Sequence, residues 1–554
     1  MMKQFIGDRE DVLRRLAIIC QEVLAVDNID LELTFVEQSG NSFSIVQLMS
    51  KIMLEFDLGM FEEIFTDKPT IRQIGELIYN RSKEAAVSYE SLEYISIDDL
   101  TISSTPDLPY ELPLLPNRYS FFLQRKRNYD YWILSTPAIE LKAECDIGLL
   151  RDTLSFLFNY HDVLSTELRW INENTFTQHV VQKNIDEAIR IIDVEEGLSR
   201  LDYLEFCEQE IDKAKASIST KNNMFLVSVI KSSEFNFGLL FICAHHCILD
   251  AYSFRMVIND TFKLYSQASK GETLALAPKT TSYLSYCNTY LNFYRGKEYR
   301  YMDFWKGLAW EKYRPLVCYP ELIAGSNTEG KSLFIVKDVE VKNAIEYSSK
   351  RYGALQYTCF EIMLSAITKA YCQLANSQAL LIAVTLHGRE SFAEGLDLSR
   401  TAGWLSETVP VLIEYSENVS KLLQSVSSTL SISMYKGKSF EYLANLSESK
   451  DHRAFINKLP RPQISINYIP PTFEQPNYHD IGVPVEVIGR GLIDRSDTER
   501  VFLVSGGMYF AHGKLNLSWD FSEDILDKEV MSLFSEKCML FYNQIMNNLL
   551  KGSS

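Results

Sequence analysis

The sequence predicts a small all-α bundle followed by a larger α/β portion that folds as two lobes. Three observations lead to this prediction. The chain has 554 residues, enough for three or four folding units of about 150 residues each. Apolar residues recur at helical spacing over residues 1–82, whereas helical stretches alternate with short β-rich runs beyond residue 109. Hydrophobic residues make up 46% of the chain and charged residues 23%, as in ordinary globular proteins.

The first unit, residues 1–82, is expected to be a four-helix bundle. Periodic apolar sets run from Val12 to Leu24, from Ile45 to Met53 and from Ile71 to Ile78. The second set follows the polar turn EQSGNS and the third follows a proline, and both features favour the start of a new helix. Helices of this kind are stable when their apolar faces pack against one another.

A linker and two lobes are expected after the bundle. Residues 83–108 are rich in Ser, Glu, Asp and Thr with no sustained period, which is typical of a linker. Helical stretches such as 147–161 and β-rich runs such as 238–244 follow. Because this portion is too long for one core, we expect an N-lobe over 109–275 and a C-lobe over 276–550.

Charge and hydropathy exclude several classes of partner. The formal net charge is -18, so phosphate would be repelled and a nucleic-acid partner is not expected. The longest apolar runs, such as 237–244, fall short of the ~20 residues that cross a bilayer, so no membrane association is expected. The N-terminus, MMKQFIGDREDVLRRL, lacks the apolar core of a secretory signal. We therefore expect a cytoplasmic protein.

Ten cysteines are scattered without a CxxC pair. This distribution favours reduced, mostly buried thiols over a disulfide framework. No structural metal site is predicted from their spacing.

Ser42 is the first candidate for chemistry. It stands at the start of the second apolar set, where its hydroxyl is exposed and a helix N-terminus favours an attached anion. The alternative is that Ser42 is a simple N-cap, and the short motif alone favours that interpretation.

The wider context of Ser42 favours modification. The segment GNSFSIVQLMSKI, followed by FEEIFTDKPTIRQIGELI, resembles the carrier-protein family of nonribosomal peptide and polyketide synthases. The resemblance covers residues 1–82, with Asn41 where Asp or His is usual. It implies that Ser42 carries 4'-phosphopantetheine, whose thiol holds an acyl or aminoacyl thioester. It also implies a phosphopantetheinyl transferase and an adenylation domain or other loading enzyme as partners, because this chain has no adenylation motif.

Two adjacent histidines, His245 and His246, form the second candidate site. They follow the apolar run FGLLFICA, and successive residues at a strand end project to opposite sides. A neutral imidazole is suited to removing a proton near pH 7. Core histidines, a polar loop and a zinc site with Cys243 and Cys247 are alternatives. Zinc is the least favoured because the chain would have to bend sharply to converge four ligands. The motif alone leaves catalysis and core packing open.

The segment HHCILDA resembles the HHxxxDG motif of the condensation and epimerization superfamily. The resemblance implies two chloramphenicol-acetyltransferase-like lobes with a tunnel between them, and His246 as the central catalytic residue. The matching segments fall in family order from about 109 to 550: LPLLP at 112–116, Phe121-Phe122, HDVL at 161–164, Ser253-Phe254-Arg255, HGRE at 387–390, SRTAGW at 399–404 and Ile466-Asn467-Tyr468.

HGRE and SRTAGW look more like epimerization domains than ordinary condensation domains. Epimerization needs two acid/base groups, and in similar epimerases one is the second histidine and the other a glutamate at the position of Thr385. A threonine hydroxyl is not a base near neutral pH, and nothing in the sequence places Glu390 in the tunnel. Condensation can use one histidine. We therefore favour amide formation, with epimerization as the alternative.

Other departures from the family motifs lead to a third hypothesis. Ala251 replaces the motif glycine, and Ser165 stands where many relatives carry the arginine that pairs with the motif aspartate. An unpaired buried Asp250 would be costly unless Arg255 or Arg389 supplies the charge. A tunnel that has lost catalytic groups would instead serve as a docking platform for a partner protein.

The resemblance also assigns expected roles to six further positions. His245 and Asp250 are expected to shape the catalytic loop, and Tyr468 to line the acceptor side of the tunnel. Trp404 and Ser253 are expected to bridge or line the lobes, together with Thr385. The chain is thus predicted to deliver a carrier-bound thioester to an amine or aminoacyl acceptor, in contact with other synthetase modules.

Overall fold

A computed structural model describes most of the chain, and only its described residues are discussed. These are residues 9–24, 26–35, 37–38, 48, 52, 55–56, 69–85, 107–124, 132–142, 144–172, 175–194, 197–221, 223–232, 238–316, 332–342, 344–350, 357–389, 392, 396–470, 481–485 and 500–551.

The N-terminal unit is helical. Helices α1 (Arg9–Leu24) and α4 (Ile71–Ala85) pack together, with Leu16 and Ile74 in their shared core. This confirms the all-α character of the unit, while Ser42 lies outside the described residues. The same core contains four further buried side chains from the segment between the helices, namely Phe35, Leu48, Ile52 and Phe56.

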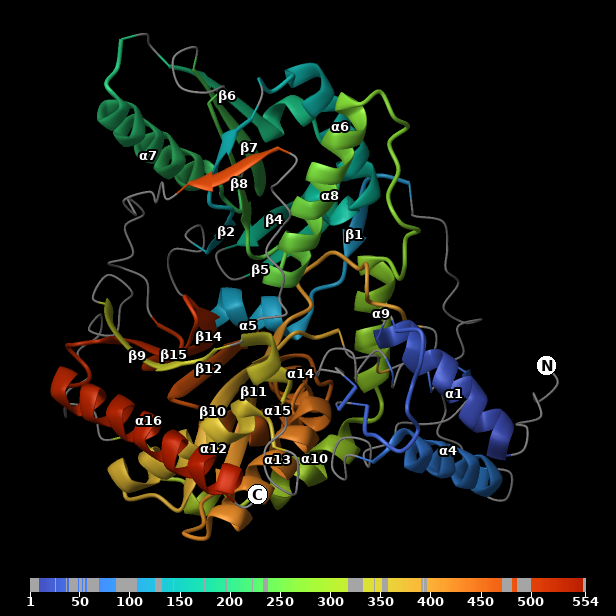
Figure 1. Cartoon of the computed structure of the whole chain (residues 1–554), viewed down its shortest axis with the longest axis vertical. Helices are drawn as coiled ribbons and strands as arrows, with labels where there is room; N and C mark the ends of the chain where they lie inside the picture. The colour runs from blue at the N-terminus through green and yellow to red at the C-terminus, as the bar shows by residue number, and fades with distance from the viewer. Residues whose placement is uncertain are drawn as a thin grey trace.

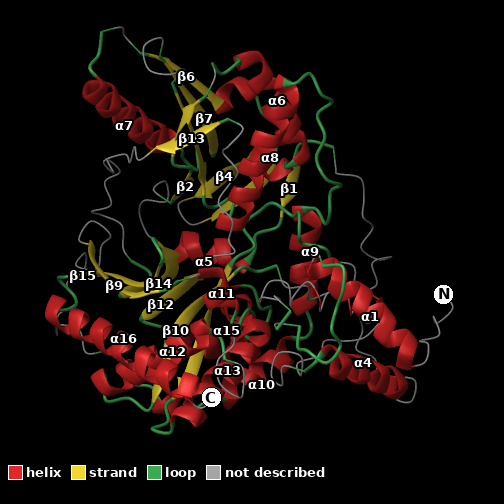
Figure 2. Ribbon diagram, in the orientation of Figure 1, coloured by secondary structure: helices red, strands yellow, loops and turns green. Residues whose placement is uncertain are grey.

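A six-stranded sheet forms the N-lobe, in the order β13-β3-β8-β7-β6 with β2 paired to β8 (Figures 1 and 2). Alternate residues of β7 and β8 face opposite layers: Cys243 packs under α7, whereas Ala244 packs with α6 and α8. The strands are β2 (Ile133–Ser135), β3 (Ala138–Leu141), β6 (Ile189–Asp193), β7 (Phe225–Lys231), β8 (Leu239–His245) and β13 (Gly482–Val485), and the helices α6 (Ile147–Tyr160), α7 (Arg200–Ser217) and α8 (Ala251–Ser269).

A smaller three-stranded sheet, in the order β1-β5-β4, lies beside this lobe. Its strands are β1 (Tyr110–Leu112), β4 (Thr166–Asn172) and β5 (Thr175–Val180). The helices that connect these parts and lead toward the second lobe are α5 (Pro116–Gln124), η1 (Asp162–Ser165), η2 (Ile185–Ala188), α9 (Tyr283–Tyr294), α10 (Glu298–Gly307) and η3 (Trp310–Lys312).

The C-lobe contains a second six-stranded sheet, in the order β11-β10-β12-β14-β15-β9. Figure 1 shows α12 and α16 on one side of this sheet and the N-lobe on the other. The elements are β9 (Ser332–Glu340), α11 (Ala344–Ser349), α12 (Cys359–Leu374), β10 (Ala379–Leu386), β11 (Glu407–Glu414), α13 (Val419–Lys436), α14 (Ser439–Asn445), α15 (Lys450–Lys458), β12 (Ile464–Ile469), β14 (Val504–Ala511), β15 (Lys514–Ser522) and α16 (Lys528–Lys551). The two-lobed α/β architecture expected from the sequence is confirmed.

The lobes exchange segments instead of dividing at one point in the chain. Strand β13 comes from the C-terminal half but pairs with β3 of the N-lobe sheet. Helix α9 and the segment 396–405 pack in the same core as α6 and α8, whereas the buried core of the C-lobe begins at Tyr313. A division of the chain near 275 therefore does not coincide with the division of the cores.

Every helix in the described part of the chain is too short or too polar to span a membrane. The nine cysteines in that part are buried thiols. No cluster of metal-ligating side chains is found among the described residues.

Candidate active site

The candidate site is built where β8 ends and α8 begins. The buried run of β8 stops at His245, a turn covers residues 246–248, and Asp250 caps α8. The Asp250 carboxylate accepts a hydrogen bond of 2.8 Å from the backbone N–H of Ser253, a typical N-cap arrangement. The local sequence thus places two histidines and a capping aspartate within six residues of a strand-to-helix junction.

His245 faces the interior. Its side chain is fully buried, and its Nδ1 accepts a hydrogen bond of 3.1 Å from the backbone N–H of Cys247. Its own backbone N–H donates to the carbonyl of Met224 at 2.8 Å. These contacts stabilise the turn, and the expected shaping role of His245 stays a prediction.

His246 lies on the outer side of the turn and is half-buried. Its imidazole stacks on the indole of Trp132, with ring centroids 3.8 Å apart and planes 14° apart. Trp404 meets the imidazole edge-on, with centroids 5.3 Å apart. The backbone N–H of His246 donates to the carbonyl of Trp132 at 2.8 Å. Two aromatic side chains from distant parts of the sequence therefore enclose this imidazole.

The cysteines beside the histidines do not join them as ligands. Cys243 lies in the core under α7, whereas Cys247 lies in the opposite core with α8. Burial raises the pKa of Cys243 to about 12, so its thiol stays protonated near neutral pH. The four residues considered for zinc therefore do not converge on one point.

Asp250 is buried and paired. The guanidinium of Arg389 binds both carboxylate oxygens, with nitrogen-oxygen distances of 2.9 and 3.1 Å. The backbone N–H groups of Leu405 and Ser406 donate to the same carboxylate at 2.9 and 3.0 Å. Burial alone would raise the pKa of Asp250, but Arg389 and the backbone donors hold that pKa below its ordinary value. Arg389, one of the two cations considered, therefore supplies the charge.

Ser253 completes the junction between α8 and the 399–406 segment. Its hydroxyl donates to the carbonyl of Gly403 at 2.7 Å and accepts from the N–H of Gly403 at 3.0 Å. A nitrogen of Arg389 donates to the same hydroxyl at 2.6 Å. A Cβ at Gly403 would lie 2.1 Å from the ring of Tyr283, so only glycine fits in SRTAGW here. Ser253 thus joins the two segments and is fully buried.

Trp404 is tied to three elements. Its carbonyl accepts from the side chain of Asn117 at 3.3 Å and from the Tyr283 hydroxyl at 3.4 Å. Its indole N–H donates to the Ser406 hydroxyl at 3.1 Å. The side chain is 5% exposed and touches His246, so Trp404 connects the histidine turn to α5 and α9.

Thr385 and Tyr468 lie on the C-lobe sheet. Thr385 is half-buried and its hydroxyl lies 3.3 Å from that of Thr408 on the neighbouring strand. Its strand neighbours pack against the helices, so Thr385 faces the side of the sheet that carries no helix of this lobe. Tyr468 stacks on Phe360 of α12, with centroids 5.0 Å apart, on the helix-covered side. A role for Tyr468 at the acceptor side of a tunnel stays a prediction.

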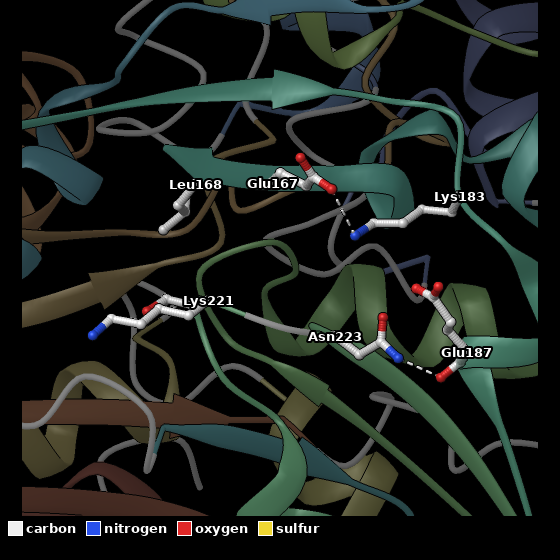
Figure 3. A pocket seen from close by; sticks show the side chains of 7 residues that line it. Glu167, Leu168, Lys183, Glu187, Lys221 and Asn223 are labelled. Carbon is white, nitrogen blue, oxygen red and sulfur yellow. Dashed lines mark hydrogen bonds and ion pairs between the residues drawn. The ribbon is translucent and has the colours of Figure 1, made fainter. Parts of the chain in front are cut away.

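A cavity of about 460 Å³ lies elsewhere in the N-lobe (Figure 3). Lys183 and Glu167 form an ion pair of 3.3 Å at its wall, and the side chain of Asn223 donates to the backbone of Glu187. None of the residues predicted from the sequence lines it. A smaller cavity of about 190 Å³ includes Ser165 in its lining. Neither cavity is lined by His245, His246 or Asp250, so the candidate site is located by the contacts of the His246 turn and not by a cavity.

Comparison with known families gives two matches. Residues 111–554 match the condensation domain family, and residues 14–78 match the family described as phosphopantetheine attachment site. The chain belongs to the condensation domain family and carries a phosphopantetheine attachment domain ahead of it, as in modules of nonribosomal peptide synthetases. Its prosthetic group is accordingly 4'-phosphopantetheine. The described core of the carrier domain includes buried Phe35 and Leu48.

Individual relatives agree with the family match. One of the linear gramicidin synthase proteins of Brevibacillus parabrevis is 25% identical over 530 residues, covering 94% of this chain and 10% of that protein. The chain thus spans about a tenth of that relative's length. The epimerization domain from the third module of tyrocidine synthetase B superposes with a TM-score of 0.66 at 17% identity, covering 81% of this chain and 100% of that one. The starter condensation domain of rhizomide synthetase gives 0.57 at 11% identity, covering 79% and 97%.

Proposed function

We propose that this chain forms an amide bond between a thioester held on its own carrier domain and an amine acceptor. The observation that carries the proposal is the environment of His246, a half-buried imidazole fixed between two indoles at the lobe junction. Thr385, at the position of the second acid/base group in similar epimerases, offers only a hydroxyl. A site with one imidazole suits condensation better than stereochemical inversion.

The proposed reaction needs one proton carrier. When loaded, the prosthetic group supplies a thioester whose carbonyl carbon is the electrophile. The amine nitrogen bonds to that carbon, the carbon-sulfur bond breaks, and the sulfur leaves as a thiol. The amine loses the proton that the sulfur gains, so His246 can accept it and return it. Asp250 and His245 hold the turn and do not exchange protons in this scheme.

The partners follow from this chemistry. A phosphopantetheinyl transferase would modify Ser42, and an adenylation domain or other loading enzyme would attach the acyl group. Other synthetase modules would present the aminoacyl acceptor, in the cytoplasm. The acidic excess of the chain, a formal net charge of -18, suits docking to basic faces of such proteins.

Intact-mass spectrometry tests the first step. Incubation with coenzyme A and a phosphopantetheinyl transferase should add one phosphopantetheine to the wild-type chain and none to Ser42→Ala. An unchanged mass in the wild type would contradict the carrier assignment.

An amide-formation assay tests the second step. With an aminoacyl thioester loaded on Ser42 and an amine supplied, His246→Ala should lower the rate about 10²- to 10⁴-fold, the usual contribution of general acid-base catalysis. His512→Asn is the matched control, because His512 is exposed and Asn tolerates its left-handed backbone, φ 51°. Equal rates for the two variants would remove His246 from the mechanism and favour the docking-platform hypothesis.

Epimerization is the second candidate, favoured by the TM-score of 0.66 to an epimerization domain. The two candidates differ in the α-proton of the tethered aminoacyl group. In deuterium oxide, the wild-type chain should show no His246-dependent exchange of that proton, whereas Thr385→Glu should introduce exchange by restoring a second acid/base group. Exchange in the wild type would overturn the preference for condensation.

A further inference from the structure

The strand that pairs with the end of β8 contains one extra residue. Ser135 of β2 lies opposite Cys243, and Ile139 of β3 lies opposite Leu240. Three residues, 136–138, therefore face two residues, 241–242. The backbone N–H of Ile242 donates to the Thr136 hydroxyl at 3.1 Å, in place of a backbone carbonyl. This arrangement is a β-bulge, of the kind that re-aims side chains beside functional sites.

The bulge decides which residue lies opposite His246. If the pairing of β3 with β8 continued without the extra residue, Ile133 would lie opposite His246. After the bulge, Ile133 pairs with His245 and the carbonyl of Trp132 accepts the N–H of His246 at 2.8 Å. Because side chains alternate along a strand, a shift of one residue would also turn the indole to the other face.

Two indoles restrain the His246 imidazole, one by stacking and one by an edge-on contact. Trp132 covers one face of the His246 ring at 3.8 Å, with the planes 14° apart, so rotation about the last side-chain bond would break the stack. Trp404 stands edge-on to both rings, with centroids 5.1 Å from Trp132 and 5.3 Å from His246. The plane of the His246 ring is thus set by its contacts with these two indoles.

We propose that Trp132 is a positioning residue for His246, placed by the bulge at Thr136–Pro137. The inference rests on the proposed function, because it gives the orientation of His246 its catalytic meaning. Trp132 does not contact the reacting atoms in this scheme. It fixes the direction along which the imidazole meets the amine, and a misplacement of about 1 Å in such a group costs on the order of 10²-fold in rate.

Two substitutions at Trp132 distinguish the effect of ring stacking on kcat from the effect of side-chain volume in the amide-formation assay. Trp132→Leu should lower kcat about 10- to 100-fold and leave KM for the amine within about twofold. Trp132→Phe retains a ring and should stay within about threefold of the wild-type kcat. Trp170→Leu is the control, because Trp170 is a half-buried indole on β4 that packs on Phe176, away from the histidine turn. Wild-type kcat in Trp132→Leu, or equal loss in the Phe and Leu variants, would overturn the proposal.

A second readout does not depend on amide formation. Diethyl pyrocarbonate modifies accessible imidazoles, and peptide mass spectrometry measures the rate at each histidine, with exposed His512 as internal reference. Trp132→Leu should raise the modification rate of His246 at least about threefold, since one ring face loses its cover. An unchanged rate would refute the positioning role. A wild-type chain that makes no amide would count against the proposed function, while the modification rates would still decide the role of Trp132.

Discussion

Two regions four residues apart in the sequence are fixed in opposite ways. The Asp250 carboxylate accepts five hydrogen bonds, two from Arg389 and one each from the backbone of Ser253, Leu405 and Ser406, and the residue is buried. The His246 imidazole is held by aromatic contacts with Trp132 and Trp404, and its backbone N–H donates a hydrogen bond to Trp132. Hydrogen bonds reach both oxygens of the carboxylate, whereas aromatic stacking sets the plane of the imidazole. The contacts of Asp250 join α8 to Arg389 and to the 405–406 segment, whereas the stacking of His246 orients an imidazole for the proposed proton transfer.

The largest expected effect follows from breaking the ion pair between Asp250 and Arg389. Arg389→Met leaves a buried carboxylate without its cation and should lower the free energy of unfolding by about 3–5 kcal/mol. Urea denaturation followed by circular dichroism measures this change.

Arg461→Met is the control for that experiment. The Arg461 side chain is 40% exposed and pairs with Glu441 at 3.0 Å, and such surface pairs contribute about 1 kcal/mol or less. Equal losses in the two variants would mean that the junction does not carry the stability assigned to it. The double variant Asp250→Asn with Arg389→Met should recover part of the loss, because the uncompensated charge is gone.

A smaller effect is expected at His161, which follows α6 and pairs with Asp260 in the middle of α8. His161 is buried and its Nε2 lies 2.7 Å from Asp260, which also binds Arg400 at 2.6 Å. Burial lowers the pKa of His161 from 6.5, although Asp260 acts to raise it. Because His161 binds a proton more readily in the unfolded chain, its contribution to the free energy of unfolding is fully present above pH 6.5. That contribution is lost as the pH falls toward the pKa of His161 in the folded chain.

Titration of stability measures this contribution. The wild-type chain should lose up to about 1.4 kcal/mol per pH unit just below pH 6.5 from this group, and His161→Gln should lack that component. The corresponding loss from Asp250, whose folded pKa is depressed, occurs only below pH 3.8, so the two windows are separate. An identical slope in both chains would show that His161 is not the titrating group.

The smallest effect is expected at Thr385, which belongs to neither region. Its hydroxyl makes one hydrogen bond of 3.3 Å to exposed Thr408. Thr385→Val should change the free energy of unfolding by about 0.5 kcal/mol or less and the rate of amide formation by less than about twofold. A tenfold loss of rate would place this hydroxyl among the catalytic groups and sharpen the contrast with His246.

The sequence predicts most of the polar junction and little of the aromatic site. Asp250 and Arg389 lie in recognisable motifs, and the cost of an unpaired buried carboxylate is enough to suggest a cation. Trp132 lies in no motif. It reaches His246 only through an antiparallel pairing and a bulge, and sequence patterns do not specify register at that resolution. The nearest signal is Thr136-Pro137, a break in an otherwise β-rich run.

The division of the chain shows the same limit. A continuous apolar run identifies the strand that becomes β8, because its burial follows from local composition. It does not reveal that α9 packs with the first core, or that Tyr468 faces α12 while Thr385 faces the other side of the sheet. These outcomes depend on which surfaces meet in three dimensions.

The pairing of β13 with β3 has a consequence for the order in which the protein is made. Until the ribosome has released residues 482–485, β3 has no partner on its outer side and is an exposed sheet edge. At about 5–20 residues per second, some 240 residues separate His245 from this strand, a delay of roughly 10 to 50 s. The N-lobe therefore completes its sheet only after most of the C-lobe has been synthesised. An excised N-lobe ending near 275 would keep this edge open and should be prone to aggregation.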